Sequence, residues 1–476
     1  MTSPTCPIKF GTDGWRALIA EDYTFDNVRW AARGVAQYLI DTGDADKGVA
    51  IGYDCRFMSE RFARAAAETI AAAGIPAHLG SSYAPTPAVA CAIRQHQLAG
   101  GIVITASHNP WAWNGFKFKA SYGGSAGPEI IKKVEAVLPG VAAEDSLRRP
   151  PAALEEVDLV APYLAHLEKV IHLDAIARRG FQFVVDPLYG AARGHFQRLF
   201  TRYKIRSTEI HGEADPLFGG LHPEPIEPHI AALQKAVVER QADAGFATDG
   251  DADRIGAVDR DGRFIDSHRI FAILLQYLVE VRELKGAVVK TFSTTKLVDQ
   301  LAKKHGLELI ETPIGFKHIC DHMLAREVII GGEESGGIGV PALGGPERDG
   351  MMNGLLLAEA MAHYGKSLGE LVDELHREFG PHYYGRVDLH LKAGQKERAI
   401  EQASAAGLTS YAGFSVEQRE TLDGVKMYLA DGQGGSGWLL VRPSGTEPLL
   451  RVYCEASTEK LVHDALAATE KLIRNL

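Results

Sequence analysis

The chain of 476 residues has no long apolar run, few cysteines and no excess of positive charge. No stretch approaches the ~18 residues needed to cross a bilayer, and the first residues lack a basic segment followed by an apolar core. We therefore expect a cytoplasmic protein with no membrane partner.

The five cysteines are scattered without a CxxC pair, which fits a reducing compartment and excludes a zinc-ribbon framework. A net charge of −10 argues against nucleic acid as a partner.

The length is about three times the ~150 residues typical of one domain, so we expect several domains. The 46% hydrophobic and 24% charged residues match soluble globular chains, which argues against disorder or coiled coil as the main architecture. Because the overall balance is acidic, an anionic ligand would need a local cluster of Arg and Lys.

Short β-branched runs alternate with amphipathic stretches along most of the chain, which predicts an α/β fold. Helices are expected over Phe25–Ile40, capped by Thr24, and over Arg61–Ala73, closed by Gly74. The predicted strands are Val49–Tyr53, Ile102–Thr105, Phe181–Val185, Gly245–Thr248, Val288–Thr291, Val328–Ile330 and Trp438–Val441.

A proline-rich, charged and apolar-poor segment, Pro139–Glu156, is the best candidate for a linker after a first domain. Further breaks are expected just after Arg254 and between Phe379 and Lys392. These positions predict domains over residues 1–145, 146–255, 256–378 and 379–476.

Four loops each follow one of the short apolar runs, which in a parallel sheet places them at the carboxyl ends of strands, where α/β proteins bind ligands. The first contains Ser107 and His108, with Lys117 soon after. A hydroxyl beside a histidine and a lysine is equipped for nucleophilic or phosphoryl-transfer chemistry. The alternative is a polar turn in which Ser107 merely bonds the backbone.

The second loop carries Asp249, Asp251 and Asp253, followed by Arg254. Three carboxylates at this spacing can converge on one side of an extended segment, where they repel each other unless a cation lies between them. Oxygen-only ligands favour a hard ion, and magnesium completed by a phosphoryl oxygen suits three carboxylates. An EF-hand is excluded because Arg254 stands where that motif needs glycine. A solvated acidic turn is the alternative.

The third and fourth loops could bind the hydroxyls and the phosphate of a phosphorylated sugar. In residues 331–337, glycines permit close approach of a ligand, and Glu333 and Ser335 could form hydrogen bonds with sugar hydroxyls. A flexible glycine turn explains the same residues equally well. In residues 442–448, backbone amides, two hydroxyls and a guanidinium would make a phosphate cradle, with an ordinary turn as the alternative. Together the four loops point to a phosphosugar as the ligand.

These loops, together with residues 10–16 and Gly315-Phe316-Lys317, resemble the signature segments of the α-D-phosphohexomutase superfamily, in the same order over nearly the whole chain. The superfamily includes phosphoglucomutases, phosphomannomutases and phosphoglucosamine mutases. The resemblance implies three related α/β domains with mixed sheets and a smaller C-terminal α+β domain, arranged around a central cleft.

The resemblance also implies a role for each candidate residue. Ser107 would be the phosphorylated serine, and its phosphate would join Asp249, Asp251 and Asp253 in holding one magnesium ion. Arg16, Lys117 and Arg254 would stabilise the transferring phosphoryl group, and His108 is a candidate for proton transfer. Sugar contacts would come from Glu333, Ser335, Gly315 and Lys317, and contacts to the phosphate that is not transferred from Arg442, Ser444, Gly445 and Thr446.

The activity implied by the resemblance interconverts hexose 1-phosphate and hexose 6-phosphate through a hexose 1,6-bisphosphate, which also acts as the activator. Gly337 stands where many phosphomannomutases and phosphoglucosamine mutases carry histidine, which favours glucose phosphate, with mannose phosphate as a possible second substrate. Phosphoglucosamine mutase, a metal-dependent sugar phosphatase and a non-catalytic sugar-phosphate-binding protein remain alternatives. The chain could be a monomer or a homo-oligomer.

We predict that Ser107→Ala abolishes isomerisation of glucose 1-phosphate, because the variant has no hydroxyl to carry the phosphoryl group. A coupled assay that follows the 6-phosphate product measures this. Near-wild-type turnover in the variant would remove the serine from the mechanism.

Overall fold

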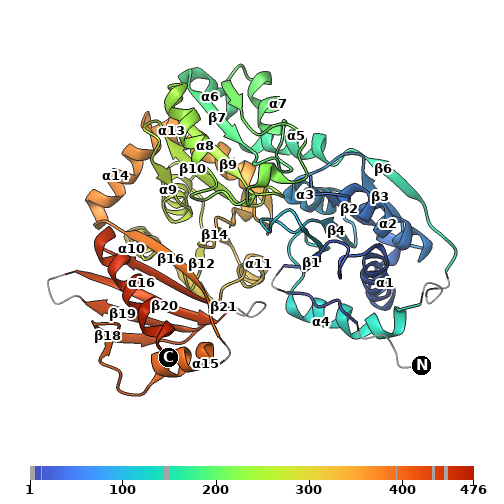
Figure 1. Cartoon of the computed structure of the whole chain (residues 1–476). Helices are drawn as coiled ribbons and strands as arrows, with labels where there is room; N and C mark the ends of the chain where they lie inside the picture. The colour runs from blue at the N-terminus through green and yellow to red at the C-terminus, as the bar shows by residue number, and fades with distance from the viewer. Residues whose placement is uncertain are drawn as a thin grey trace. The chain divides into compact units, whose positions relative to one another are not determined.

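The computed structural model describes residues 6–11, 13–143, 147, 149–392, 394–430, 435–443 and 449–476 (Figure 1). The chain forms two compact units. The first, unit 1, comprises Met1–Val289 and Gly315–Glu370, and the second, unit 2, comprises Lys290–Ile314 and Leu371–Leu476.

The first sheet of unit 1 is mixed and has the strand order β1-β5-β4-β2-β3-β6. The β1–β5 and β4–β5 pairs are antiparallel, whereas β4, β2, β3 and β6 run parallel. Its strands are β1 (Trp15–Leu18), β2 (Val49–Tyr53), β3 (Ala77–Gly80), β4 (Gly100–Ile104), β5 (Trp113–Ala120) and β6 (Leu154–Val157). Its helices are α1 (Phe25–Thr42), α2 (Ser59–Ala72), α3 (Thr86–His96) and α4 (Pro128–Val137).

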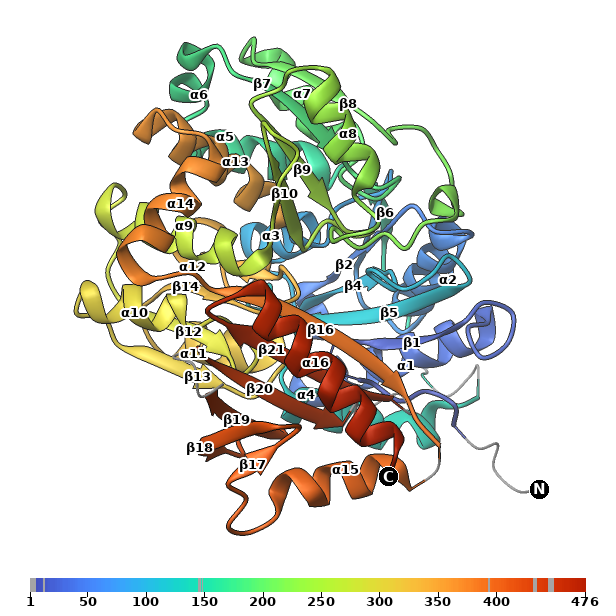
Figure 2. The same cartoon turned by 60° about the vertical axis from the view of Figure 1, so that its left-hand side comes forward.

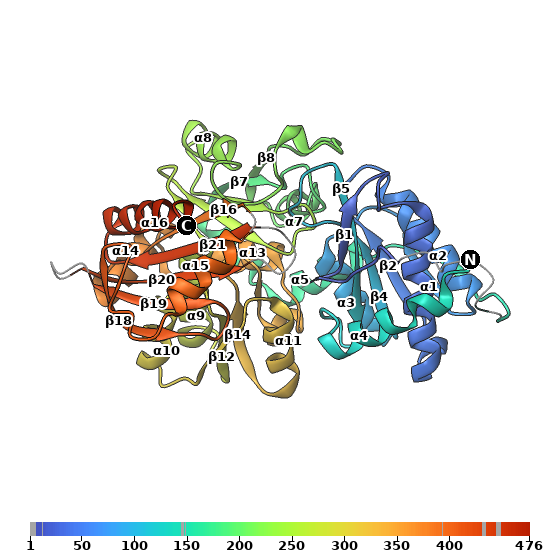
Figure 3. The same cartoon turned by 60° about the horizontal axis from the view of Figure 1, so that its bottom comes forward.

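Helices cover both faces of this sheet, with α1 and α2 on one side and α3 on the other (Figure 3). Ile51 packs into the same core as the buried faces of α1 and α2, while a β-carbon at Gly52 would lie 2.4 Å from Val89 of α3. Successive residues of β2 therefore face opposite helical layers, as a buried parallel strand requires. The predicted cap of α1 is confirmed, since the hydroxyl of Thr24 accepts the N–H of Asn27 at 3.3 Å.

The segment predicted as a linker ends in a strand rather than in a loop. Leu154–Val157 forms β6, which pairs parallel with β3, so the first sheet extends beyond the predicted boundary at residue 145. Glu155 and Glu156 are exposed there. Charged side chains are typical of edge strands, because they discourage pairing with another chain, and this charge made the segment resemble a loop.

The second sheet has the order β11-β10-β9-β7-β8. Its hairpin β9–β10 carries the acidic loop between two antiparallel strands, so the sheet also runs past the predicted boundary at residue 255. The strands are β7 (Gln182–Asp186), β8 (Arg206–Glu209), β9 (Ala244–Thr248), β10 (Ile255–Asp259) and β11 (Phe264–Ile265). The associated helices are α5 (Val160–Val170), α6 (Leu173–Arg179), α7 (His195–Arg202) and α8 (Ala231–Glu239).

The third sheet has the order β13-β12-β14-β15, with β14 and β15 antiparallel. Its strands are β12 (Ala287–Thr291), β13 (Leu309–Thr312), β14 (Val328–Gly332) and β15 (Ile338–Gly339). The helices that accompany them are α9 (Ser267–Glu280), α10 (Leu297–Lys304), α11 (Phe316–Ala325), α12 (Pro341–Gly344), α13 (Gly350–Tyr364) and α14 (Leu368–Phe379).

The last sheet is antiparallel throughout, in the order β16-β21-β20-β19-β18-β17, and α16 lies across it (Figure 2). Its strands are β16 (Tyr383–His390), β17 (Ser410–Tyr411), β18 (Phe414–Glu420), β19 (Val425–Ala430), β20 (Ser436–Pro443) and β21 (Leu449–Ala456). Its helices are α15 (Gln395–Ser404) and α16 (Glu459–Arg474). The predicted fold class, three α/β domains and a C-terminal α+β domain, is confirmed; the domain boundaries stay predictions.

None of the helices in the described ranges is both long and apolar enough to cross a bilayer. All five cysteines are free.

Unit 2 contains a fully buried cation, Lys426 on β19. Its ammonium lies 2.9 Å from a carboxylate oxygen of Glu311 and over the rings of Phe292 and Trp438, at 4.2 and 4.9 Å from their centroids. Burial nevertheless lowers the pKa of Lys426 to about 8, because the charged form loses more hydration than these partners return. The cation thus opposes folding at neutral pH.

We expect Lys426→Met to be stabilising relative to wild type at pH 7, by an amount that shrinks towards pH 10. Between the folded pKa of about 8 and the unfolded value of about 10.4, the unfolded chain binds more protons, so wild-type stability rises with pH. Urea unfolding of both proteins across this range measures the difference. Lys460→Met, which removes an exposed lysine of α16, is the control. A difference between wild type and Lys426→Met that does not change with pH would contradict the assignment.

Candidate active site

Ser107 lies in the tight loop between β4 and β5, and its side chain is almost completely buried. Its hydroxyl donates to Oδ2 of Asp249 at 2.8 Å, and Nδ1 of His108 lies 3.4 Å from the same hydroxyl oxygen. The backbone at Ser107 has φ of +53°, in the left-handed region that residues other than glycine rarely adopt. The fold thus brings the predicted nucleophile to the predicted metal loop.

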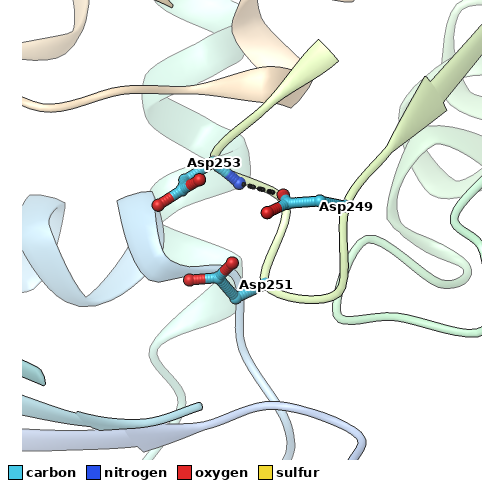
Figure 4. A group of neighbouring side chains, drawn as sticks. All are labelled: Asp249, Asp251 and Asp253. Carbon is cyan, nitrogen blue, oxygen red and sulfur yellow. Dashed lines mark hydrogen bonds between the residues drawn. The ribbon is translucent and has the colours of Figure 1, made fainter. Parts of the chain in front are cut away.

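Asp249, Asp251 and Asp253 converge in the β9–β10 hairpin, where all three are fully buried (Figure 4). One carboxylate oxygen from each lies within 4.8 Å of the others. The backbone N–H groups of Asp253 and Arg254 donate to Oδ1 of Asp249, at 3.0 and 3.1 Å, and shape the hairpin. Burial, with the charges of Asp251 and Asp253, raises the pKa of Asp249 well above its usual range.

The donor set fits a hard divalent cation. Oδ1 of Asp251 and Oδ1 of Asp253 are buried and have no hydrogen-bond partner, and a buried carboxylate oxygen without a partner is costly. All the available ligand atoms are oxygens, which magnesium prefers. Asp249, Asp251 and Asp253 could therefore hold a metal ion.

Lys117 on β5 supplies a positive charge in direct contact with the cluster. Its ammonium lies 2.8 Å from Asp251, 3.1 Å from Asp253 and 2.9 Å from Asp13. Burial disfavours the charged form, but the three carboxylates together raise the pKa of Lys117 above its ordinary value. The lysine contacts Oδ2 of both hairpin aspartates, and their Oδ1 atoms have no hydrogen-bond partner.

The two predicted arginines lie at the same cluster. Nη1 of Arg16 donates to the side chain of Asn109 at 2.6 Å; Asn109 lies in the segment of residues 105–113, which holds Ser107, ends on the first residue of β5 and is called the serine loop below. Nε of Arg254 is 3.9 Å from Oδ2 of Asp249, the oxygen that accepts the serine hydroxyl, and its Nη1 is 3.6 Å from Glu224. Arg16 of β1 therefore places a positive charge at the serine loop, and Arg254 places one beside Asp249.

Arg348, which the sequence patterns did not single out, joins the acidic hairpin to the third loop. Its guanidinium contacts Asp13, lies 2.7 Å from Asp253 and donates to Glu333 at 3.4 Å. Glu333 directly follows β14 and is buried, and burial raises its pKa to about 7 despite the opposing charge of Arg348. The only local signal was a charged run, Glu347-Arg348-Asp349, ahead of α13.

The comparisons with known proteins agree with this geometry. Four family models match in order: "Phosphoglucomutase/phosphomannomutase, alpha/beta/alpha domain I" over residues 7–143, domain II over 161–262, domain III over 266–379 and the C-terminal domain over 409–472. A phosphoglucomutase/phosphomannomutase of Thermococcus kodakarensis is 31% identical, over 98% of each chain. The chain belongs to the α-D-phosphohexomutase superfamily.

Other similar members of the superfamily are named for other sugar phosphates. A phosphoglucosamine mutase of Limosilactobacillus reuteri is 31% identical, over 96% of this chain and 95% of its own length. The crystal structure of a putative phosphomannomutase from Thermus thermophilus superposes with a TM-score of 0.85 at 33% identity, over 98% of this chain and 99% of that one. Relatives of similar identity are thus named for glucose, mannose and glucosamine phosphates.

The remaining predicted residues of this phosphohexomutase belong to the third loop, to α11 and to the segment around β20. Ser335 is half-buried in the loop with Glu333, and Gly315 and Lys317 lie at the N-terminal end of α11. Arg442 is on β20 of unit 2, where its Nε is 3.0 Å from Asp423. Ser444, Gly445 and Thr446 lie outside the described residues. The roles of all these residues stay predictions.

Gly337 is tightly enclosed by the two residues that connect the hairpin to the third loop. A β-carbon at this position would lie 2.4 Å from Cδ of Arg348 and 3.1 Å from a carboxylate oxygen of Glu333. Arg348 cannot move aside without leaving Asp13 and Asp253. The absence of a side chain at Gly337 therefore allows the buried Arg348 network in this phosphohexomutase.

We expect Gly337→Ala to lower the free energy of unfolding by about 1–3 kcal/mol, the usual cost of inserting a methyl group into a packed interior. Chemical denaturation measures the change. Gly140→Ala is the matched control, because a β-carbon there meets nothing within 4 Å, and we expect it to change stability by no more than about 0.5 kcal/mol. Equal stabilities of the two variants would show that Arg348 is not held as described.

Proposed function

We propose that this phosphohexomutase interconverts hexose 1-phosphate and hexose 6-phosphate, with glucose phosphate as the preferred substrate. The observation that carries the proposal is the contact between the Ser107 hydroxyl and Asp249 inside a buried cluster of three aspartates. A hydroxyl held against a metal-binding set is the arrangement that phosphoryl transfer requires.

Ser107 would serve as the phosphoryl carrier. In the first half-reaction the bond between phosphorus and Oγ of Ser107 breaks as the free hydroxyl oxygen of the sugar monophosphate bonds to phosphorus, and that hydroxyl loses its proton. The resulting hexose 1,6-bisphosphate turns end for end and returns its other phosphate to Oγ. A trace of hexose 1,6-bisphosphate would activate the protein by loading Ser107 in the same way.

One magnesium ion would be held by Asp249, Asp251, Asp253 and an oxygen on Ser107, where it would supply positive charge to the transferring group. With three aspartates its site sums to −1, which would still repel a phosphoryl dianion. Arg16, Lys117 and Arg254 would offset that charge. His108, whose Nδ1 is 3.4 Å from Oγ of Ser107, would hold or release the proton.

Substrate would be held at both ends. We assign sugar hydroxyls to Glu333 and Ser335, assisted by Gly315 and Lys317. The phosphate that is not transferred is assigned to Arg442, Ser444, Gly445 and Thr446. The intermediate must bind in two orientations. A site that recognises a phosphate group, whichever sugar carbon carries it, can bind both orientations.

Phosphoglucosamine mutase is the second candidate, because a relative of that name matches along nearly the whole chain. Glucose, mannose and glucosamine differ at C2, and contacts to the C3 and C4 hydroxyls sense that carbon only weakly. The glycine at position 337 supports glucose, because many mutases of the other two kinds carry histidine there. A sugar phosphatase would use the same serine and metal but pass the phosphoryl group to water.

We expect kcat/KM to be highest for glucose 1-phosphate, lower for mannose 1-phosphate and lowest for glucosamine 1-phosphate. Each reaction is followed with Mg²⁺ and the corresponding 1,6-bisphosphate, and both the 6-phosphate and inorganic phosphate are measured. A metal chelator should abolish turnover, and restored Mg²⁺ should recover it. Release of inorganic phosphate as the main product would establish a phosphatase, and the highest value for glucosamine 1-phosphate would transfer the assignment to the second candidate.

A further inference from the structure

The side chain of Arg56, three residues after the end of β2, is completely buried against the serine loop. A guanidinium has five N–H donors in a fixed fork, and all five are used here. One goes to Asp54 in the same segment, and the other four go to backbone carbonyls of the serine loop. The acceptors are Oδ2 of Asp54 at 3.0 Å and the carbonyl oxygens of Ser107 at 2.6 Å, Asn109 at 2.7 Å, Pro110 at 2.9 Å and Trp113 at 3.1 Å.

Asp54 connects the same pair to the other side of Ser107. Oδ2 of Asp54 accepts the hydroxyl of Thr105 at 2.6 Å, and that hydroxyl oxygen accepts the backbone N–H of Ser107 at 2.9 Å. The hydroxyl of Ser59 donates to the remaining oxygen of Asp54 at 2.8 Å. Both backbone polar groups of Ser107 therefore end on the Asp54–Arg56 pair, its carbonyl directly and its N–H through Thr105.

This connection matters because the conformation of Ser107 is costly by itself. The left-handed region is unfavourable for an L-residue because the β-carbon comes too close to the following carbonyl oxygen, and Ser107 adopts it with φ of +53°. The four carbonyl oxygens that accept from Arg56 also have to point towards one place, the position of its guanidinium. A buried positive charge with a planar fork satisfies them together, whereas a lysine ammonium has three donors and no fork.

We propose that Arg56 is a positioning residue for the phosphoryl-carrying serine: it holds the loop so that Oγ of Ser107 is directed at the acidic hairpin. The proposal rests on the function proposed above. Arg56 acts through the backbone of Ser107, since its five donors are occupied by Asp54 and the loop carbonyls rather than by the hairpin carboxylates. Its guanidinium also packs over the ring of Phe218, 4.9 Å from the centroid, which fixes the plane of the fork.

Arg56→Lys, compared with Arg64→Lys, tests the proposal by steady-state kinetics. Arg64 lies on the neighbouring α2, where it is exposed and paired with Glu156, so its variant should keep wild-type kcat and KM. We expect Arg56→Lys to lower kcat about 100-fold, the effect of a misplacement near 1 Å, with KM for the sugar phosphate unchanged. Wild-type kcat, or a raised KM at unchanged kcat, would overturn the proposal.

Chemical rescue separates positioning from a general loss of stability. A cavity of about 330 Å³ is lined by Arg56, Tyr53 and Arg193, among others, and we expect guanidinium ion to enter the space left by Arg56→Ala from it. We expect millimolar guanidinium to raise kcat of this variant and to leave Arg64→Ala unaffected. A loss of kcat in Arg56→Ala that guanidinium does not recover would count against a positioning role.

A crystal structure of Arg56→Ala provides a measurement independent of turnover. We expect Ser107 to leave the left-handed region and its hydroxyl to lose contact with Asp249. An unchanged serine loop would overturn the positioning role, whatever the activity. If wild type turned over none of the three sugar phosphates, the proposed function would fail, and this structure would still decide whether Arg56 holds the loop.

Discussion

The repulsion among three buried aspartates is the constraint on which the rest of the site depends. Asp249, Asp251 and Asp253 share one turn of a hairpin, without access to water. Carboxylates this close and this dry cannot all remain ionised unless cations and N–H donors surround them. The surrounding residues of unit 1 answer that requirement, with two backbone N–H groups on Asp249 and the side chains of Lys117 and Arg348 on the other two.

The compensation is incomplete in a way that suits phosphoryl transfer. Lys117 occupies one oxygen of Asp251 and one of Asp253, and their other oxygens are buried without a hydrogen-bond partner. A divalent cation would complete the set, and the hydroxyl of Ser107 already contacts the third carboxylate. The negative charges that would make an empty hairpin unstable would therefore favour a divalent cation there, and the surrounding lysine and arginines would offset the repulsion of an anionic group on Ser107. Stability and chemistry are set here by one electrostatic balance.

Several parts of this site could be predicted from the sequence because their signals are local. The spacing of three aspartates, and a serine followed by histidine after a short apolar run, can be read without a fold. Placing both loops at the carboxyl ends of strands also follows from general α/β rules, and the structure brings Ser107 to Asp249. The strand Leu154–Val157 was missed, because its charged edge residues have the composition of a linker.

Arg348, Asp13 and Arg56 could not be assigned these contacts from local patterns. Arg348 meets Asp13 across 335 positions of the chain, and Arg56 reaches Ser107 across 51. A single arginine or aspartate has no periodicity, and its value depends on which distant groups burial forces against it. The sequence by itself determined the chemistry that is available, namely a hydroxyl, three carboxylates and several cations on an α/β framework. Only the tertiary structure decided which cation neutralises which carboxylate and how the serine is held, because charge pairing and loop conformation depend on distances that chain order does not contain.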